Sequence, residues 1–282
     1  MMYRAKFKSG LLLLLIAVSI VLLFTVGCTS GTTKTQENGF AVSGSSRLVV
    51  NSQNGNVEVI AGAGNEVVVK ALLKNADKVE YELKQVGDTI TVDVKVDKTW
   101  WLFSDGGADI TITAPAKTDV AIETSNGYVE LHGLEGSGSV KTSNGLIVLD
   151  SLKGEFDAST SNGRIECGSM QGSLKLRTSN GKVEVSNMEG TVDAETSNGS
   201  VLFSGNMTAG GDNRLITSNG SVYVEFQGIS SLVLDVETSN GEVYCDLSLV
   251  DTVNKKGRLV GTIGAGESDL YIRTSNGDVG IK

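Results

Sequence analysis

Four charged residues near the middle of the sequence are, by type, the best candidates for chemistry. Arg164 and Glu166 alternate along one segment, and Lys182 and Glu184 alternate in the same way along a later one. Two carboxyl groups about 5 Å apart are the apparatus of a retaining glycosidase. Alternating Glu and Lys is also the ordinary pattern of a solvated strand face, and we favour that interpretation. We therefore assign no catalytic residue, and a polysaccharide lyase or hydrolase is kept as the alternative.

Metal and cofactor chemistry finds little support in the residues present. His132 is the single histidine of the chain and has no Cys or His at ligand spacing, so we expect no metal site and no cofactor. The repeated turns offer Ser and Asn where calcium-binding β-rolls carry Asp, and calcium prefers carboxylate oxygens. Specific calcium sites are therefore not expected either.

The N-terminal segment, 1–27, has the layout of an export signal. Arg4, Lys6 and Lys8 precede an apolar run over 11–26, which ends at Gly27-Cys28. As a helix the run would reach ~24 Å against a hydrocarbon core of ~30 Å, which favours cleavage over a permanent span. Cys28 resembles the acylated cysteine of a prokaryotic lipobox, although Thr25 stands where such boxes usually have Leu, and an uncleaved membrane anchor is the alternative. Both interpretations place the rest of the chain outside the cytoplasm, anchored to a membrane at the cell surface or in the periplasm.

The exported part is acidic. Three of the 24 Lys and Arg, but none of the 33 Asp and Glu, lie in the segment 1–27, so 21 basic side chains remain against 33 acidic ones. This balance argues against binding to nucleic acid. The segment 28–46 is rich in Thr, Ser, Gly and Gln and is predicted to be a flexible tether.

The sequence contains an internal repeat, and the structural elements that position any functional site must be built from it. The tetrapeptide Thr-Ser-Asn-Gly occurs eight times, beginning at Thr124, Thr142, Thr160, Thr178, Thr196, Thr217, Thr238 and Thr274. The first five copies are evenly spaced, the next two intervals are slightly longer, and the last interval is twice the first. A fixed period of this kind is typical of a solenoid.

Two irregular places in the repeat can be interpreted in the same terms. The interval between the last two copies is interpreted as two repeats with a degenerate turn near Lys256-Gly257, and Ser52-Gln53-Asn54-Gly55 as a ninth, divergent copy. The asparagines of the eight regular copies are Asn126, Asn144, Asn162, Asn180, Asn198, Asn219, Asn240 and Asn276.

Each repeat carries two short stretches of alternating apolar residues, separated by turn residues, and none shows helical spacing. We predict an all-β fold, a single-stranded parallel β-solenoid with rungs of about 18 residues. Asn-Gly between alternating strands also signals hairpins, so an antiparallel meander or sandwich is the alternative. The solenoid is favoured because identical corners would stack their asparagines into an amide ladder, with Gly supplying a corner of positive φ.

Neighbouring rungs would also pair charges and separate the cysteines. Residues one repeat apart are opposite in sign at Glu135 and Lys153, at Asp157, Lys175 and Asp193, and at Arg177 and Glu195. Arg164 with Lys182 and Glu166 with Glu184 are of like sign, a clash that diagonal pairing could relieve. Cys167 and Cys245 would lie four rungs or ~19 Å apart, too far for a disulfide, so two buried free thiols are predicted.

The two ends of the solenoid are predicted to differ. The segment 47–123 forms a strand-rich cap, and 124–282 forms the repeats. Trp100, Trp101 and Phe103 are either an aromatic contact patch for a sugar ring or, as we favour, a hydrophobic plug. The sequence stops at Ile281-Lys282 within a strand, which would leave an unpaired edge open to self-association.

These repeats, the strand-rich cap and the exported N-terminus resemble the prokaryotic β-strand-repeat family of unknown function, over about residues 45–282. The resemblance implies a surface-exposed β-solenoid with a provisional adhesive role, and it defines no catalytic or ligand residues. We therefore expect a non-enzymatic binding or structural module, tethered to a membrane, that contacts a glycan or a cell-envelope protein. A polysaccharide-active enzyme and an envelope-stress or signalling accessory are the alternatives.

Overall fold

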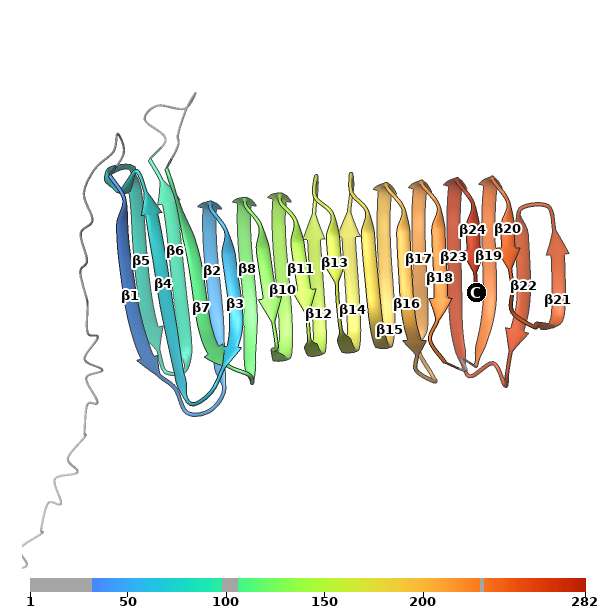
Figure 1. The fold of residues 1–282 in the computed structure, drawn as a ribbon, viewed down its shortest axis with the longest axis horizontal. Coiled ribbons are helices and arrows are strands. Elements are labelled where there is room, and N and C mark those ends of the chain that lie inside the picture. The colour runs from blue at the N-terminus through green and yellow to red at the C-terminus, as the bar shows by residue number, and fades with distance from the viewer. Residues whose placement is uncertain (1–31, 98–105, 229–230) are drawn as a thin grey trace, which may run out of the picture.

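The computed structural model describes residues 32–97, 106–228 and 231–282 (Figure 1). The export signal with Cys28, and the aromatic residues Trp100, Trp101 and Phe103, lie outside the described residues, so the predictions made for them stand as predictions. The part of the chain that is described is all-β, with one 3-10 turn (Ala76–Lys78) and no α-helix.

The middle of the chain is a stack of rungs, each built from a long strand and a short strand. The long strands are β8 (Thr118–Asn126), β10 (Glu135–Asn144), β12 (Leu152–Thr160), β14 (Met170–Thr178), the second half of β15 (Val183–Asn198) and β17 (Asp212–Asn219). The short strands are β9 (Val129–His132), β11 (Ile147–Asp150), β13 (Ile165–Cys167), the first half of β15, β16 (Val201–Met207) and β18 (Val222–Phe226). Every pairing between these rungs is parallel, which excludes the meander for this region.

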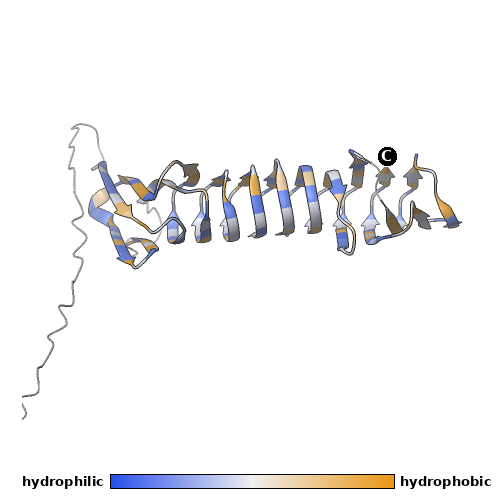
Figure 2. Ribbon diagram, turned by 90° about the horizontal axis from the view of Figure 1, so that it is seen from below, coloured by the Kyte–Doolittle hydropathy of each residue, from blue (hydrophilic) through white to orange (hydrophobic). Residues whose placement is uncertain are grey.

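The alternating apolar residues point between the two rows of strands and form the core. Ile147, Ile165, Val183 and Val201 occupy equivalent places on successive rungs, and all four are fully buried. Figure 2 accordingly shows hydrophobic and hydrophilic residues alternating along the strands of each rung. The core is one continuous cluster along the stack. Each rung therefore buries its apolar face only by lying against its neighbours.

The asparagines of the repeat form a continuous amide ladder along one corner of the stack. Each side-chain N–H donates to the side-chain oxygen of the next asparagine over 2.8–2.9 Å, and the ninth copy at Asn54 joins the row. The repeat threonines point inward beside it, where the Thr178 hydroxyl, for example, donates to the Gly163 carbonyl over 2.9 Å. Identical corners are thus explained by hydrogen bonds between rungs.

In the middle of the stack, the glycine that follows each asparagine serves a different purpose from the one expected. Gly145 and Gly163 are not among the residues of positive φ. A Cβ on Gly163 would lie 1.8 Å from the carbonyl oxygen of Gly145 on the rung below, so the close approach of two backbones demands Gly there. Positive φ is found, as predicted, at the corner glycines Gly55, Gly127 and Gly277. It is also found at the second glycine of the repeat, as in Gly154 at +128° and Gly172 at +129°.

The N-terminal end closes the stack with antiparallel strands. Its strands are β1 (Lys34–Ala41), β2 (Ser46–Asn54), β3 (Val57–Gly62), β4 (Glu66–Lys74), β5 (Val79–Val86), β6 (Thr89–Val96) and β7 (Gly107–Pro115). β2 and β3 form a rung against β8 and β9, while β4 pairs antiparallel with both β7 and β1. The prediction of a flexible tether over 28–46 is therefore wrong for β1, which is held by its strand pairing and by burial of Phe40.

The C-terminal end departs from the order of the sequence. Its strands are β19 (Leu232–Asn240), β20 (Val243–Cys245), β21 (Val250–Lys255), β22 (Arg258–Ile263), β23 (Ser268–Asn276) and β24 (Val279–Ile281). The last rung, β23 with β24, lies between the rung β17 with β18 and the rung β19 with β20 (Figure 1). We call β23 and β24 the inserted rung.

Three predictions are corrected by this order. The long interval between the last two copies of the tetrapeptide is not two parallel rungs, because β21 and β22 form an antiparallel hairpin that turns at Lys256-Gly257 and pairs with β19. Nor does β24 leave an unpaired edge, since it pairs with β18 on one side and with β20 on the other. Cys167 and Cys245 are free thiols as predicted, but five strand steps separate them, and Cys245 on the outermost short strand is only half-buried.

Candidate functional site

The charged residues suspected of catalysis form ordinary surface ion pairs. The structure places Glu166 beside Glu184 as expected, but the diagonal pairs are absent. Arg164 Nε lies 2.7 Å from Glu166 Oε1, and Lys182 Nζ lies 2.6 Å from Glu184 Oε2, so each acid is paired within its own rung. All four side chains are at least 36% exposed. This is the solvated strand face that the sequence favoured.

Other predicted neighbours also occur as surface pairs. Lys175 lies 4.0 Å from Asp157 and Arg177 lies 3.4 Å from Glu195, as predicted. Arg177 also contacts Asp193, a pair that was not predicted. His132 Nδ1 is 3.0 Å from Asp150 Oδ2 at the surface. Within the described ranges no three His, Cys, Asp or Glu side chains are grouped to hold a metal ion.

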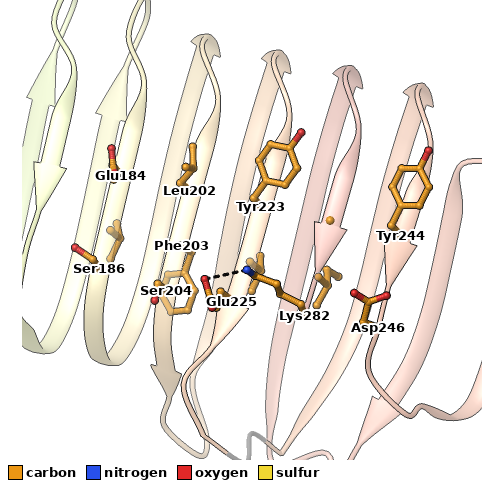
Figure 3. Close-up of a pocket in the computed structure, with 14 residues that line it drawn as sticks. Glu184, Ser186, Leu202, Phe203, Ser204, Tyr223, Glu225, Tyr244, Asp246 and Lys282 are labelled. Atoms are coloured by element: carbon orange, nitrogen blue, oxygen red, sulfur yellow. Dashed lines mark ion pairs between the residues drawn. The ribbon is translucent and has the colours of Figure 1, made fainter.

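An exposed row of side chains near the C-terminal end stands out from these pairs. Leu202 on β16, Tyr223 on β18, Gly280 on β24 and Tyr244 on β20 occupy consecutive outward positions across the strands. We call these four residues the tyrosine strip. Tyr223 is 49% exposed and Tyr244 is 55% exposed, and they are the most exposed aromatic side chains among the described residues. In Figure 3 both rings lie over the outer face of the sheet, with their hydroxyls toward the same strand end.

Gly280 sets the geometry of the strip. Because the inserted rung stands between β18 and β20, the two tyrosines are two strand spacings apart, ~9.6 Å rather than ~4.8 Å. A Cβ on Gly280 would lie 3.0 Å from Cδ1 and 3.3 Å from Cε1 of Tyr223, so the ring of Tyr223 leans over the glycine. Gly280 adds no side chain of its own between the two rings, so the surface there is formed by the glycine backbone and the leaning Tyr223 ring.

Polar side chains flank the strip on both sides. On one side lie Ser221, Asp278 and Glu242, where the Glu242 amide donates to Asp278 Oδ1 over 2.9 Å. On the other side lie Ser204, Glu225, Lys282 and Asp246, where Lys282 Nζ is 3.3 Å from Glu225 Oε2 (Figure 3). The tyrosine strip and the second polar row line a shallow groove of about 430 Å³. An apolar floor between hydrogen-bonding margins is the usual composition of a ligand site.

The Tyr244 hydroxyl has a charged hydrogen-bond partner. The Tyr244 hydroxyl donates to a Glu242 carboxylate oxygen, and this hydrogen bond to a nearby negative charge raises the pKa of Tyr244. The ring of Tyr244 is thereby fixed in orientation and neutral at ordinary pH.

Sequence reasoning missed the tyrosine strip. A signal was present, because Tyr223 and Tyr244 occupy the outward position that Glu166 and Glu184 hold in earlier repeats. Their separation by Gly280 could not be inferred, since it depends on the position of the inserted rung.

No helix in the described part of the chain is long and apolar enough to cross a membrane.

Comparison with known proteins gives a family and a set of distant structures. None of the curated proteins compared with the chain matches it. A putative adhesin from Bacteroides fragilis NCTC 9343 is 13% identical, with a TM-score of 0.48, over 88% of this chain and 97% of that one. A putative cell adhesion protein from Clostridium sporogenes ATCC 15579 is 13% identical, with a TM-score of 0.28, over 88% of this chain and 99% of that one.

A third solved structure carries a different description. A putative lipid binding protein from Parabacteroides distasonis ATCC 8503 is 11% identical, with a TM-score of 0.29, over 88% of this chain and 97% of that one. Likenesses this distant decide nothing about function. The family model of Toastrack DUF4097, by contrast, matches residues 45–282, and the chain belongs to this family of unknown function.

Proposed function

We propose that the chain is a non-enzymatic binding module, held outside the cytoplasm by its N-terminus, that contacts a glycan through the tyrosine strip. The observation that carries this proposal is the pair of half-exposed tyrosine rings on a flat sheet face, bordered by carboxylates, serines and a lysine. Aromatic rings that combine an apolar face with a polar tip are enriched where proteins meet ligands. Sugars present apolar C–H faces and hydroxyl edges, which suit such a surface.

The stacked rungs support this role mechanically. The strip is anchored on strands whose inward neighbours, Val222, Val224 and Val279, are at most 2% exposed. A contact surface on such a packed sheet is preorganised, so little ordering entropy is lost when a ligand binds. Anchoring through Cys28 would present the module at the cell surface, where several copies could bind one polymer together.

The test is retention of the purified protein on insoluble cell-wall and host polysaccharides, with reducing-end release followed in the same samples. We expect retention without release, and loss of retention in the double variant Tyr223→Ala, Tyr244→Ala. Tyr128→Ala is the matched control, because this tyrosine lies at the far end of the stack and also donates to a glutamate, Glu130. Retention that the double variant leaves intact would overturn the assignment of the site. Turnover of a retained polysaccharide would overturn the non-enzymatic function.

A further inference from the structure

We propose that the tyrosine strip binds an uncharged, linear polysaccharide that lies along the axis of the stack, across the strands. This inference rests on the proposed function and names the class and direction of its ligand. Three features of the described residues carry it: the separation of the two tyrosines, the placement of the polar side chains, and the balance of charge around the strip.

The separation of the tyrosines matches a repeating polymer. Tyr223 and Tyr244 are ~9.6 Å apart along the stack, with Gly280 midway. An extended β-linked glycan presents the same ring face again after two sugar units, a comparable length. One sugar can therefore lie over each tyrosine, and the sugar between them lies over Gly280, which adds no side chain of its own beside the leaning Tyr223 ring. Leu202 extends the apolar floor by one further strand.

The polar rows run parallel to the strip and face the edges of such a chain. Each row is two positions along the strand from the tyrosines, or ~6.6 Å to either side. Asp278 and Glu242 border one edge, and Glu225, Lys282 and Asp246 border the other. Equatorial hydroxyls of a pyranose project sideways from the ring, so they point at these carboxylates and at the lysine. Hydrogen bonds to charged groups are the stronger ones, which makes both rows suited to hold a diol.

The charges around the strip select against acidic polymers. In the two polar rows, four carboxylates, those of Asp278, Glu242, Glu225 and Asp246, stand against the ammonium of Lys282, which is already paired with Glu225. A uronate, sulfate or phosphate on the ligand would meet like charge on both sides. The ligand class is therefore a neutral glycan.

The position of the inserted rung is what creates this spacing. If β20 followed β18 directly, the two rings would be one strand apart and would stack on each other. The inserted rung places Gly280 between them and adds Lys282 to one polar row. The non-sequential order of the rungs thus has a direct consequence for the surface.

The experiment is calorimetric titration of the purified protein with cello-oligosaccharides and chito-oligosaccharides, from the disaccharide to the hexasaccharide. Affinity is expected to rise at least tenfold from the disaccharide to the tetrasaccharide, which can cover Leu202, both rings and Gly280, and to change little beyond it. Tyr223→Ala and Tyr244→Ala should each remove this gain, whereas Tyr128→Ala should not. Oligogalacturonides of equal length should bind at least tenfold more weakly, and Glu225→Gln with Asp246→Asn should narrow that difference.

Gly280→Leu tests the open centre, with Gly210→Leu at an uncrowded site as its comparison. It should weaken the tetrasaccharide more than the disaccharide. If Gly280→Leu fails to fold, the length series on the unaltered protein still decides. Affinity that does not grow with length, or equal binding of oligogalacturonides, would overturn this inference. Polysaccharide retention that still needs both tyrosines would then leave the proposed function standing, whereas retention independent of them would end both.

Discussion

The middle and the C-terminal end of the stack are built from the same repeat, but they differ in the order of their rungs and in the residues at the outward positions. From β8 to β15 each rung lies against the one that precedes it in sequence, and the outward position holds Val148, Glu166 and Glu184. At the C-terminal end the inserted rung interrupts this order, and the same position holds Tyr223, Gly280 and Tyr244. The regular region provides a rigid scaffold, and the irregular region provides a surface that differs from it.

The largest effect that separates the two regions should come from removing the inserted rung. A chain that ends after Glu267 loses the buried side chains of Leu270, Ile272, Val279 and Ile281, each contributing ~1.5–3 kcal/mol. β19 and β20 then lose their parallel partners. Hydrogen exchange followed by mass spectrometry should show lost amide protection over 232–263 and intact protection over 118–198. Persistent protection in β19 would mean that the C-terminal end holds together without the inserted rung.

The regular region could be predicted well from the sequence, because each repeat makes the same contacts with the next repeat along the chain. Spacing alone placed Glu135 beside Lys153 and Asp157 beside Lys175, and the structure has both. It failed at the inserted rung because adjacency there is not set by period. Ile281 has a strand partner on each side because β24 inserts between β18 and β20, which are formed by earlier parts of the chain. No local sequence pattern indicates that these two strands are separated.

The next largest effect concerns the glycines of the corners. Gly163→Ala puts a Cβ 1.8 Å from the Gly145 carbonyl oxygen in the middle of the stack, where neither backbone can move aside. We expect a loss of about 3 kcal/mol in the free energy of unfolding, measured by urea denaturation.

Gly210→Ala is the control for this substitution. Gly210 has φ of +77° and no heavy atom near its hypothetical Cβ, so the substitution should cost about 1 kcal/mol through backbone strain alone. Equal costs at the two sites would show that conformation, and not the close approach of rungs, is why the corners carry glycine.

A smaller effect should distinguish the middle of the amide ladder from its end. Asn162 donates to Asn144 and accepts from Asn180, whereas Asn240, on the last rung of the ladder, has only the bond to Asn276. Asn162→Ala should cost about 1–2 kcal/mol and Asn240→Ala about half as much, by the same denaturation measurement. If the ladder hydrogen bonds did not contribute to stability, both substitutions would change the free energy of unfolding by the same small amount.

The candidate site was less predictable than the fold for a reason visible in its residues. Glu166 and Glu184 stand out in the sequence as candidate catalytic residues, because acidic and basic side chains can be recognised as possible catalysts from residue type alone. Tyr223 and Tyr244 form a candidate binding surface only because they lie on the same face of the sheet, with Gly280 between them. That relation exists across three strands that are not consecutive in the chain.

The smallest effect, one of reactivity, compares the two described cysteines. Burial raises the pKa of Cys167 to about 12, and partial burial raises that of Cys245. The thiolate is the nucleophile, so both react slowly in the folded protein. Iodoacetamide at pH 8 should label the half-exposed Cys245 at least tenfold faster than Cys167, and denaturant should abolish the difference. Peptide mass spectrometry, which also separates Cys28, measures this.

The same thiol makes stability depend on pH in the middle of the stack. In the unfolded chain Cys167 ionises near its ordinary pKa of ~8.5, but in the folded chain it keeps its proton to about pH 12. Between these values the unfolded state binds fewer protons than the folded state, so this thiol makes stability fall as pH rises. Cys167→Val fills a similar volume without titrating, and its urea midpoint should fall less between pH 8 and pH 10 than that of the unaltered protein. Equal falls would mean that water reaches Cys167, and that the middle rungs are as open as the C-terminal end.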